Sequence, residues 1–236
     1  MAVEFRPARR TDARDIARLF QISSEGASDY IWSQLAASGE ALLDVGERRY
    51  ARDDVDFSWQ NCLIAEAEGG VVGMMHSYAM REDPEPTPPT DPVLAPYADM
   101  EVLDSLYISS LALHEGWRNQ GLGVQFLRHA KKRAEQFGLN GLSLIDCAAN
   151  TGARRFYERH GFGIVKTCQV VPHPMIRVTG EAHLMYRARI RLSTPEGLHT
   201  IAVGQSVDNV FVPRCKPYPP RLAGLRSKNN QSKWRF

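Results

Sequence analysis

The sequence is poor in cysteine and has no long apolar segment. Its four cysteines are Cys62, Cys147, Cys168 and Cys215, and their spacing is that of no common metal site. No apolar stretch approaches the roughly 20 residues that a membrane-spanning helix needs. The first residues carry charges in place of the apolar core of a signal peptide. We therefore expect a cytoplasmic protein with reduced thiols, with Cys62 and Cys147 in the core or in strands.

The histidines show no metal-binding spacing, and the net charge is close to zero. The seven histidines include no His-Glu-x-x-His spacing, so we expect no metal cofactor. The 29 basic and 27 acidic residues are unevenly distributed, because residues 191–236 hold eight basic and two acidic residues. That segment is rich in proline and lacks regular periodicity, so we favour an irregular basic tail. A nucleic-acid tether and a read-through from an altered frame are the alternatives.

Hydrophobic periodicity predicts alternating strands and helices before this tail. We expect strands near residues 2–6, 61–67, 70–80, 102–113, 141–148, 162–171 and 181–190. We expect helices near 11–22, in parts of 28–50 with a break at Ser38-Gly39, and near 121–137 and 151–160, with Thr11 or Asp12 as the first N-cap. Six prolines in residues 81–100 predict a long loop without regular structure. This order of elements fits a mixed sheet flanked by helices.

The most informative segment is residues 118–123, Arg-Asn-Gln-Gly-Leu-Gly, between an apolar strand and an amphipathic helix. A glycine-containing turn at a helix N-terminus brings backbone amides close to a ligand, and an arginine beside it suits a pyrophosphate. A P-loop is excluded because no lysine follows the glycines. A dinucleotide-binding fingerprint is excluded because the third glycine is missing.

A second segment supports the same interpretation. A buried strand over residues 142–149 is followed by Asn150 and then by Ala153, Phe156-Tyr157 and Gly161-Phe162. Together the two segments resemble the GCN5-related N-acetyltransferase (GNAT) superfamily, in order and in separation. The resemblance covers roughly residues 3–190. It implies an α/β fold with a mixed, mostly antiparallel central sheet, as in acyl-CoA N-acyltransferases, and acetyl-CoA as co-substrate.

The resemblance also implies roles for particular residues. The backbone amides of Asn119, Gln120, Gly121, Leu122 and Gly123 would bind the cofactor pyrophosphate, with Arg118 nearby. The backbone of Leu111 and Leu113 would pair with the pantetheine arm like an added strand. Asn150 would contact the same arm, and it is also a natural N-cap for the next helix. Tyr157 would protonate the leaving thiolate as general acid.

One position departs from the family pattern. Ser109 stands where many members have a glutamate that accepts the amine proton. Glu101, Asp104 and Asp146 are alternative proton acceptors, and a chain of water molecules would also serve.

The resemblance also implies that the acetyl acceptor binds at residues 24–50 and the proline-rich loop 81–100. Tyr30 and Trp32, with Glu25 and Asp29 nearby, suit a cationic amine, but we favour the alternative that Trp32 and Ile31 pack their helix on the sheet. The acceptor would be an amine-bearing small molecule, a protein N-terminus or a lysine, and the protein is a possible homodimer. We expect no membrane or nucleic-acid partner. The leading hypothesis is an N-acetyltransferase, and the alternative is a non-catalytic acyl-CoA-binding regulatory module.

Overall fold

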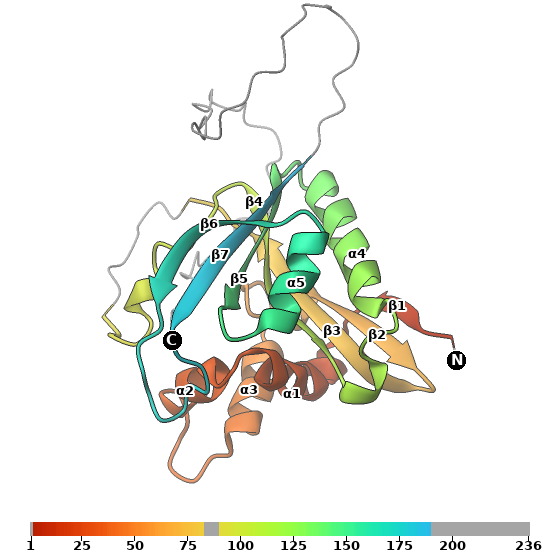
Figure 1. Cartoon of the computed structure of the whole chain (residues 1–236). Coiled ribbons are helices and arrows are strands. Elements are labelled where there is room, and N and C mark those ends of the chain that lie inside the picture. The colour runs from red at the N-terminus through yellow and green to blue at the C-terminus, as the bar shows by residue number, and fades with distance from the viewer. Residues whose placement is uncertain (1, 83–89, 190–236) are drawn as a thin grey trace, which may run out of the picture. The chain divides into compact units, whose positions relative to one another are not determined.

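A seven-stranded sheet is the centre of the computed structural model, which describes residues 2–82 and 90–189. The strand order is β1-β2-β3-β4-β5-β7-β6, and all neighbours are antiparallel except β4 and β5 (Figure 1). The strands are β1 (Glu4–Pro7), β2 (Cys62–Ala67), β3 (Gly70–Ala79), β4 (Ser105–Leu113), β5 (Gly141–Cys147), β6 (Gly163–Gln169) and β7 (Glu181–Ala188).

Helices cover both faces of this sheet. The α-helices are α1 (Ala13–Ser23), α2 (Ala27–Ser33), α3 (Leu42–Tyr50), α4 (Leu122–Gln136) and α5 (Thr151–Arg159). Short 3₁₀ turns are η1 (Arg10–Asp12), η2 (Trp59–Asn61), η3 (Ala95–Tyr97) and η4 (Glu115–Trp117). Figure 1 shows α1, α2 and α3 grouped together, apart from α4 and α5. Among these helices none combines the length and the apolar character needed to cross a bilayer.

The predicted fold class is confirmed. Predicted and observed boundaries agree to within three residues for every strand and for the helices α1, α4 and α5. The break expected at Ser38-Gly39 is longer, because α2 ends at Ser33 and α3 begins at Leu42. The prediction that residues 81–100 lack regular structure is wrong at η3, where Pro96 occupies the first turn and its missing N–H costs nothing. Residues 83–89 and the predicted tail 191–236 lie outside the described residues.

Asp12 occupies the N-cap position of α1, as one of the two predicted candidates. Asp12 directly precedes α1, but its side chain makes no capping hydrogen bond to that helix. Its carboxylate instead accepts from the Arg9 amide at 2.6 Å and from the Arg6 guanidinium at 2.8 Å. Asp12 therefore ties the 3₁₀ turn η1 to the edge strand β1.

Two hydrophobic cores form, one on each face of the sheet. The first lies under α1, α2 and α3 and includes Phe20, Trp32, Tyr50, Met74 and Tyr107. The second lies under α4 and α5 and includes Met75, Leu106, Phe126, Leu144 and Met185. Neighbouring strand residues such as Met74 and Met75 point to opposite faces, as the strand period of two requires.

Pairing between β4 and β5 ends early. Four register pairs join them, from Ser105↔Gly141 to Ile108↔Leu144. Beyond this point β4 continues beside β3 as far as Leu113, and β5 continues beside β7 as far as Cys147. The register of β3 and β4 also shifts here, because His76 faces Ser110 while Ser77 faces Ile108, which leaves Ser109 as the extra residue of a bulge. The two central strands therefore separate in the middle of the sheet.

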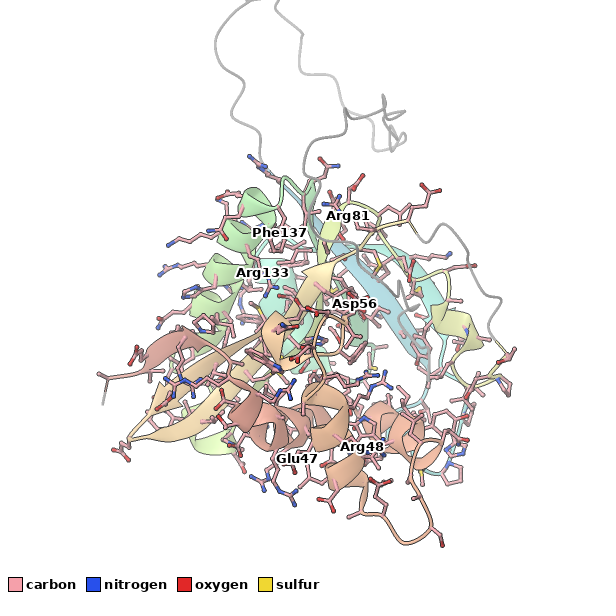
Figure 2. The ribbon with its side chains drawn as sticks, turned by 180° about the vertical axis from the view of Figure 1, so that it is seen from behind. Glu47, Arg48, Asp56, Arg81, Arg133 and Phe137 are labelled. Atoms are coloured by element: carbon pink, nitrogen blue, oxygen red, sulfur yellow. The ribbon has the colours of Figure 1, made fainter. Side chains whose placement is uncertain are left out.

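A buried histidine lies in the first core, near this bulge. His76 is fully buried, and its ring centroid is 5.4 Å from that of Tyr50 and 4.9 Å from that of Phe57. Its Nε2 donates to the backbone carbonyl of Asp56 at 2.8 Å. In the view of Figure 2, Asp56 lies between α3 and Arg133 of α4. Burial lowers the pKa of His76 to about 4 and raises the pKa of the Asp56 carboxyl to about 6.

His76 makes folding sensitive to acid. Its pKa is about 4 when folded and 6.5 in the ordinary reference state, so between these values the unfolded chain binds the extra proton and unfolding becomes easier as the pH falls. Over this pH range the free energy of unfolding falls by about 3 kcal/mol because of His76. We expect His76→Phe to remove this contribution, measured by urea unfolding at several pH values between 7 and 4.5.

The Asp56 carboxyl has the opposite effect on the stability of the fold. Its pKa rises from the reference value of 3.8 to about 6, so between these pH values the folded state binds the extra proton and acid favours folding. Its contribution is present in both proteins, so the difference between wild type and His76→Phe isolates the histidine. An unchanged pH slope in the variant would contradict the assignment.

Candidate active site

A cavity of about 540 Å³ lies where β4 and β5 separate. It is bordered by β4 from Tyr107 to Leu113 and by β5 from Leu144 to Cys147, together with the end of α1, the start of α5 and the segment between β6 and β7. Five of the predicted site residues line it, namely Leu111, Leu113, Arg118, Asn150 and Tyr157. Residues far apart in the sequence thus meet at the interruption of the sheet.

Alternate backbone N–H groups of β4 point toward β3 and toward the cavity. The His114 amide donates to the Val72 carbonyl of the neighbouring chain segment at 3.0 Å. Successive N–H groups of a strand point to opposite sides, so the amide of Ala112 also points toward β3. The amides of Leu111 and Leu113 consequently point toward the cavity. The Leu113 carbonyl accepts from Arg118 Nε at 3.2 Å, which holds this arginine beside the strand end.

The turn from β4 to α4 presents a series of free amides. Asn119 and Gly121 both have left-handed backbones, with φ of 60° and 78°. The Gly121 carbonyl accepts from Val124 N at 3.1 Å, whereas the amides of residues 119–123 have no backbone acceptor within the described residues. Free amides at the start of a 15-residue helix form a site for an anion. Of this turn, Arg118 borders the cavity itself, and the glycines follow it directly.

The two glycines of the turn serve different purposes. Gly121 needs its left-handed backbone, and a Cβ there would meet no atom within 4 Å. At Gly123 a Cβ would lie 3.0 Å from Cζ of Phe156. Gly123 therefore also allows α4 to pack closely on the Phe156 ring of α5, and its role in binding a ligand stays a prediction.

Two residues of the β5–α5 segment face the same cavity. Asn150 Oδ1 accepts from the Ala153 amide at 3.1 Å, so Asn150 is the N-cap of α5 and its side-chain amide nitrogen has no partner in the described structure. Tyr157 is half-buried against the rings of Phe156 and Phe162, with centroid distances of 5.2 Å and 5.5 Å. Burial, with a smaller contribution from the charge of Asp146, raises the pKa of the Tyr157 phenol. The phenol therefore keeps its proton at neutral pH.

Of the three alternative proton acceptors, Asp146 borders the cavity and Glu101 and Asp104 do not. Asp104 forms an ion pair with Arg81 at 2.6 Å and, like Glu101, does not border the cavity. Asp146 does border it, on the face covered by α5. Its Oδ1 lies 3.0 Å from His183 Nδ1, and its Oδ2 lies 3.6 Å from Arg154 Nε. Burial raises the pKa of Asp146.

The serines of β4 do not replace the missing glutamate. Ser110 Oγ is 2.6 Å from Ser23 Oγ of α1, and the second hydroxyl also reaches the Phe20 carbonyl. Ser109 borders the cavity at the bulge. A serine needs a basic partner to take a proton, and no hydrogen bond gives one to Ser109 within the described residues.

The aromatic residues Tyr30 and Trp32 do not line the cavity. Both side chains are buried in the first core, with exposed fractions of 6% and 1%, and Tyr30 donates to Asp91 at 2.8 Å. The packing alternative for Trp32 is therefore correct. Glu25 is the member of this group that borders the cavity. The sequence signal for it was the Glu25-Gly26 pair after α1, where both residues turn out left-handed with φ of 50° and 92°.

Comparison with known proteins agrees with this geometry. A sequence model described as the acetyltransferase (GNAT) family matches residues 29–162. The chain belongs to the GNAT acetyltransferase family. A search of curated protein sequences found no match.

Solved structures share the GNAT fold at low sequence identity. An N-acetyltransferase from Staphylococcus aureus Mu50 is 18% identical, with 78% of this chain and 99% of that chain covered and a TM-score of 0.54. The ribosomal-protein-S18-alanine N-acetyltransferase from Escherichia coli is 16% identical, with 84% and 100% covered and a TM-score of 0.51. A GNAT family acetyltransferase from Streptococcus pneumoniae is 20% identical, with 79% and 99% covered and a TM-score of 0.51.

Proposed function

We propose that this chain transfers an acetyl group from acetyl-CoA to an amine, by direct attack of the amine on the thioester. The observation that carries the proposal is the cavity at the separation of β4 and β5. It joins the free edge of β4, the arginine of the glycine turn and the Tyr157 phenol in one continuous space. The acetyltransferase domain of the proposal spans residues 3–190.

The cofactor would bind along the second-core side of this cavity. The pantetheine arm would pair with the amides of Leu111 and Leu113 as an added strand, which supplies the partners that β5 does not provide. The pyrophosphate would accept from the amides of Asn119, Gln120, Gly121, Leu122 and Gly123 and from Arg118. The side-chain amide of Asn150, whose oxygen is used in capping, has N–H groups available for a carbonyl of the arm.

The chemistry needs three conditions at the reacting carbon. Binding both substrates in one cavity holds the amine near the thioester. The Leu111 amide would meet the arm at its thioester end, where it would donate to the carbonyl oxygen and stabilise the negative charge that develops there. The N–C bond forms, the C–S bond breaks, and Tyr157 donates a proton to the sulfur as its charge develops. In net terms the nitrogen loses a proton and the sulfur gains one.

The acyl-CoA-binding regulatory module remains the second candidate. The observation in its favour is Ser109, which leaves β4 without the carboxylate that the family resemblance implies. Such a module would bind acetyl-CoA at the same amides and would not use the Tyr157 proton. A tyrosine variant therefore distinguishes the two candidates.

We expect Gly121→Glu to abolish acetyl-CoA binding in a calorimetric titration. The substituted carboxylate would stand where the pyrophosphate binds and would repel it. A matched control is Gly69→Glu in the β2–β3 turn. Gly69 has a similar φ of 75°, and a Cβ at this position, as at Gly121, would meet no atom within 4 Å. The two variants share the same backbone strain, so equal loss of binding in both, or unchanged binding in Gly121→Glu, would contradict the assigned site.

We expect Tyr157→Phe to lower kcat by about a hundredfold, the usual contribution of a positioned general acid. The affinity for acetyl-CoA should stay close to wild type, because the phenol acts on the sulfur during bond breakage. Tyr186→Phe is the control, since the Tyr186 hydroxyl donates to the Asn140 carbonyl at the far end of β5. Full turnover in Tyr157→Phe would remove the proton-donor role and favour the non-catalytic candidate.

A further inference from the structure

The cavity has two chemically different walls, one from each core. On the side of the glycine turn its lining includes Leu111, Leu113 and Tyr157, which pack with the second core. On the other side most of the lining comes from the first core and is apolar, with Phe20, Ile31, Phe57, Val93, Leu94 and Tyr107. The end of α1 adds Ser23 and Ser24, whose hydroxyls bond to Ser110 and Ser28. Because the cofactor occupies the first of these sides in the proposed function, the acceptor must enter along the second.

Glu25 is the carboxylate on this acceptor side. It borders the cavity, and no hydrogen bond or ion pair engages its side chain within the described residues. The neighbouring acids are occupied, because Asp29 accepts from Gln21 Nε2 at 2.6 Å and Asp91 accepts from the Tyr30 hydroxyl at 2.8 Å. Asp146 faces the other core and pairs with His183. A half-buried carboxylate that lacks a partner is suited to receive a cation.

The backbone around Glu25 is held firmly by the segment between β6 and β7. The Glu25 carbonyl accepts from the Arg177 amide at 2.8 Å. The next residue, Gly26, allows so close an approach that a Cβ there would lie 1.9 Å from the Met175 carbonyl oxygen. The left-handed backbone of Glu25 is unusual for a residue with a side chain, and these contacts hold it in place. These contacts fix the position of the Glu25 backbone beside the cavity.

We propose that Glu25 accepts the proton of the acceptor amine, and that the acceptor is a primary amine on an apolar body without a negative charge. This inference rests on the proposed function. Among the described residues that line the cavity, the one cation is Arg118, beside the glycine turn. An acceptor carboxylate would therefore meet an apolar wall and Glu25, with no cation to pair with. Arylalkylamines and the apolar N-terminal residue of a peptide have the required chemistry.

The reaction removes two protons from the acceptor nitrogen and adds one to the sulfur. An ammonium group loses one proton to Glu25, which later releases it to the solvent, and the free nitrogen pair attacks the thioester carbon. As the C–S bond breaks, sulfur takes a proton from Tyr157. The new amide nitrogen loses its second proton, and the tyrosine recovers one through the solvent. The products are the acetylated amine, free CoA thiol and one proton.

Steady-state acetylation of four probes by wild type tests the acceptor class. The probes are 2-phenylethylamine, L-phenylalanine, putrescine and a leucyl-glycine amide peptide. We expect kcat/KM for 2-phenylethylamine or the peptide to exceed that for phenylalanine and putrescine by about tenfold or more. The first probe and the peptide distinguish a free amine from a peptide N-terminus. Preference for phenylalanine or putrescine would overturn the inference and leave the proposed function standing.

The variant Glu25→Gln tests the proton acceptor. We expect kcat with the best probe to fall by about a hundredfold or more, while turnover of aniline changes little, because aniline is unprotonated at neutral pH and needs no proton acceptor before it attacks. Retained acetyl-CoA affinity and aniline turnover would show that the variant is folded. The control is Glu135→Gln, an exposed carboxylate on α4.

Equal kcat in Glu25→Gln and wild type would overturn the inference, as would an equal loss with aniline and with the best probe. A wild type that binds acetyl-CoA but acetylates none of the probes would also overturn it. A wild type that does not bind acetyl-CoA would instead overturn the proposed function, so the two failures are distinguishable.

Discussion

The structure depends on one interruption, the early end of hydrogen bonding between β4 and β5. After four register pairs the two central strands separate, and the bulge at Ser109 lies at the same place on the other edge of β4. A bulge increases local twist and bends its strand, which accounts for the divergence. The separation leaves backbone amides such as those of Leu111 and Leu113 without strand partners. Buried backbone groups need partners, and an extended ligand arm is the kind of partner that fits a free strand edge.

The two cores supply different walls of the cavity at this interruption. Helices α1 to α3 pack on one face of the sheet and α4 and α5 on the other, so the cavity between the strands is lined by residues of both cores. The glycine turn and Tyr157 belong to the α4–α5 side, and Glu25 belongs to the α1–α2 side. In the proposed function the two substrates would enter from opposite sides, and the reacting atoms would meet where the strands separate. The carboxylates also divide by side, since Asp146 is engaged with His183 and Arg154 while Glu25 is free of side-chain partners within the described residues.

The sequence predicted the elements well, and five of the ten predicted site residues line one cavity. Period-two and helical patterns identified every strand and the long helices because burial on one face fixes those patterns. The glycine turn with Arg118 and Gly121 could be located from local sequence, because its position depends on a strand end and a helix start, whereas Tyr157 was named from the family resemblance. The acceptor side was predicted less well. Trp32 and Tyr30 are equally consistent with a binding site and with a core, and which one applies depends on packing that residues distant in sequence supply. Gly123 shows the same limit, since its contact with Phe156 of α5 arises from tertiary packing.

The most direct test of this account is amide hydrogen exchange along β4, measured by NMR with and without saturating acetyl-CoA. Leu111 and Leu113 should exchange quickly in the free protein and slow markedly in the complex, because the cofactor arm would take the bonds that β5 does not make. Ala112, whose amide points toward β3, should exchange slowly in both states and serves as the internal reference. Unchanged exchange at Leu111 and Leu113 in the saturated complex would contradict the claim that the cofactor binds at the separation of the two strands.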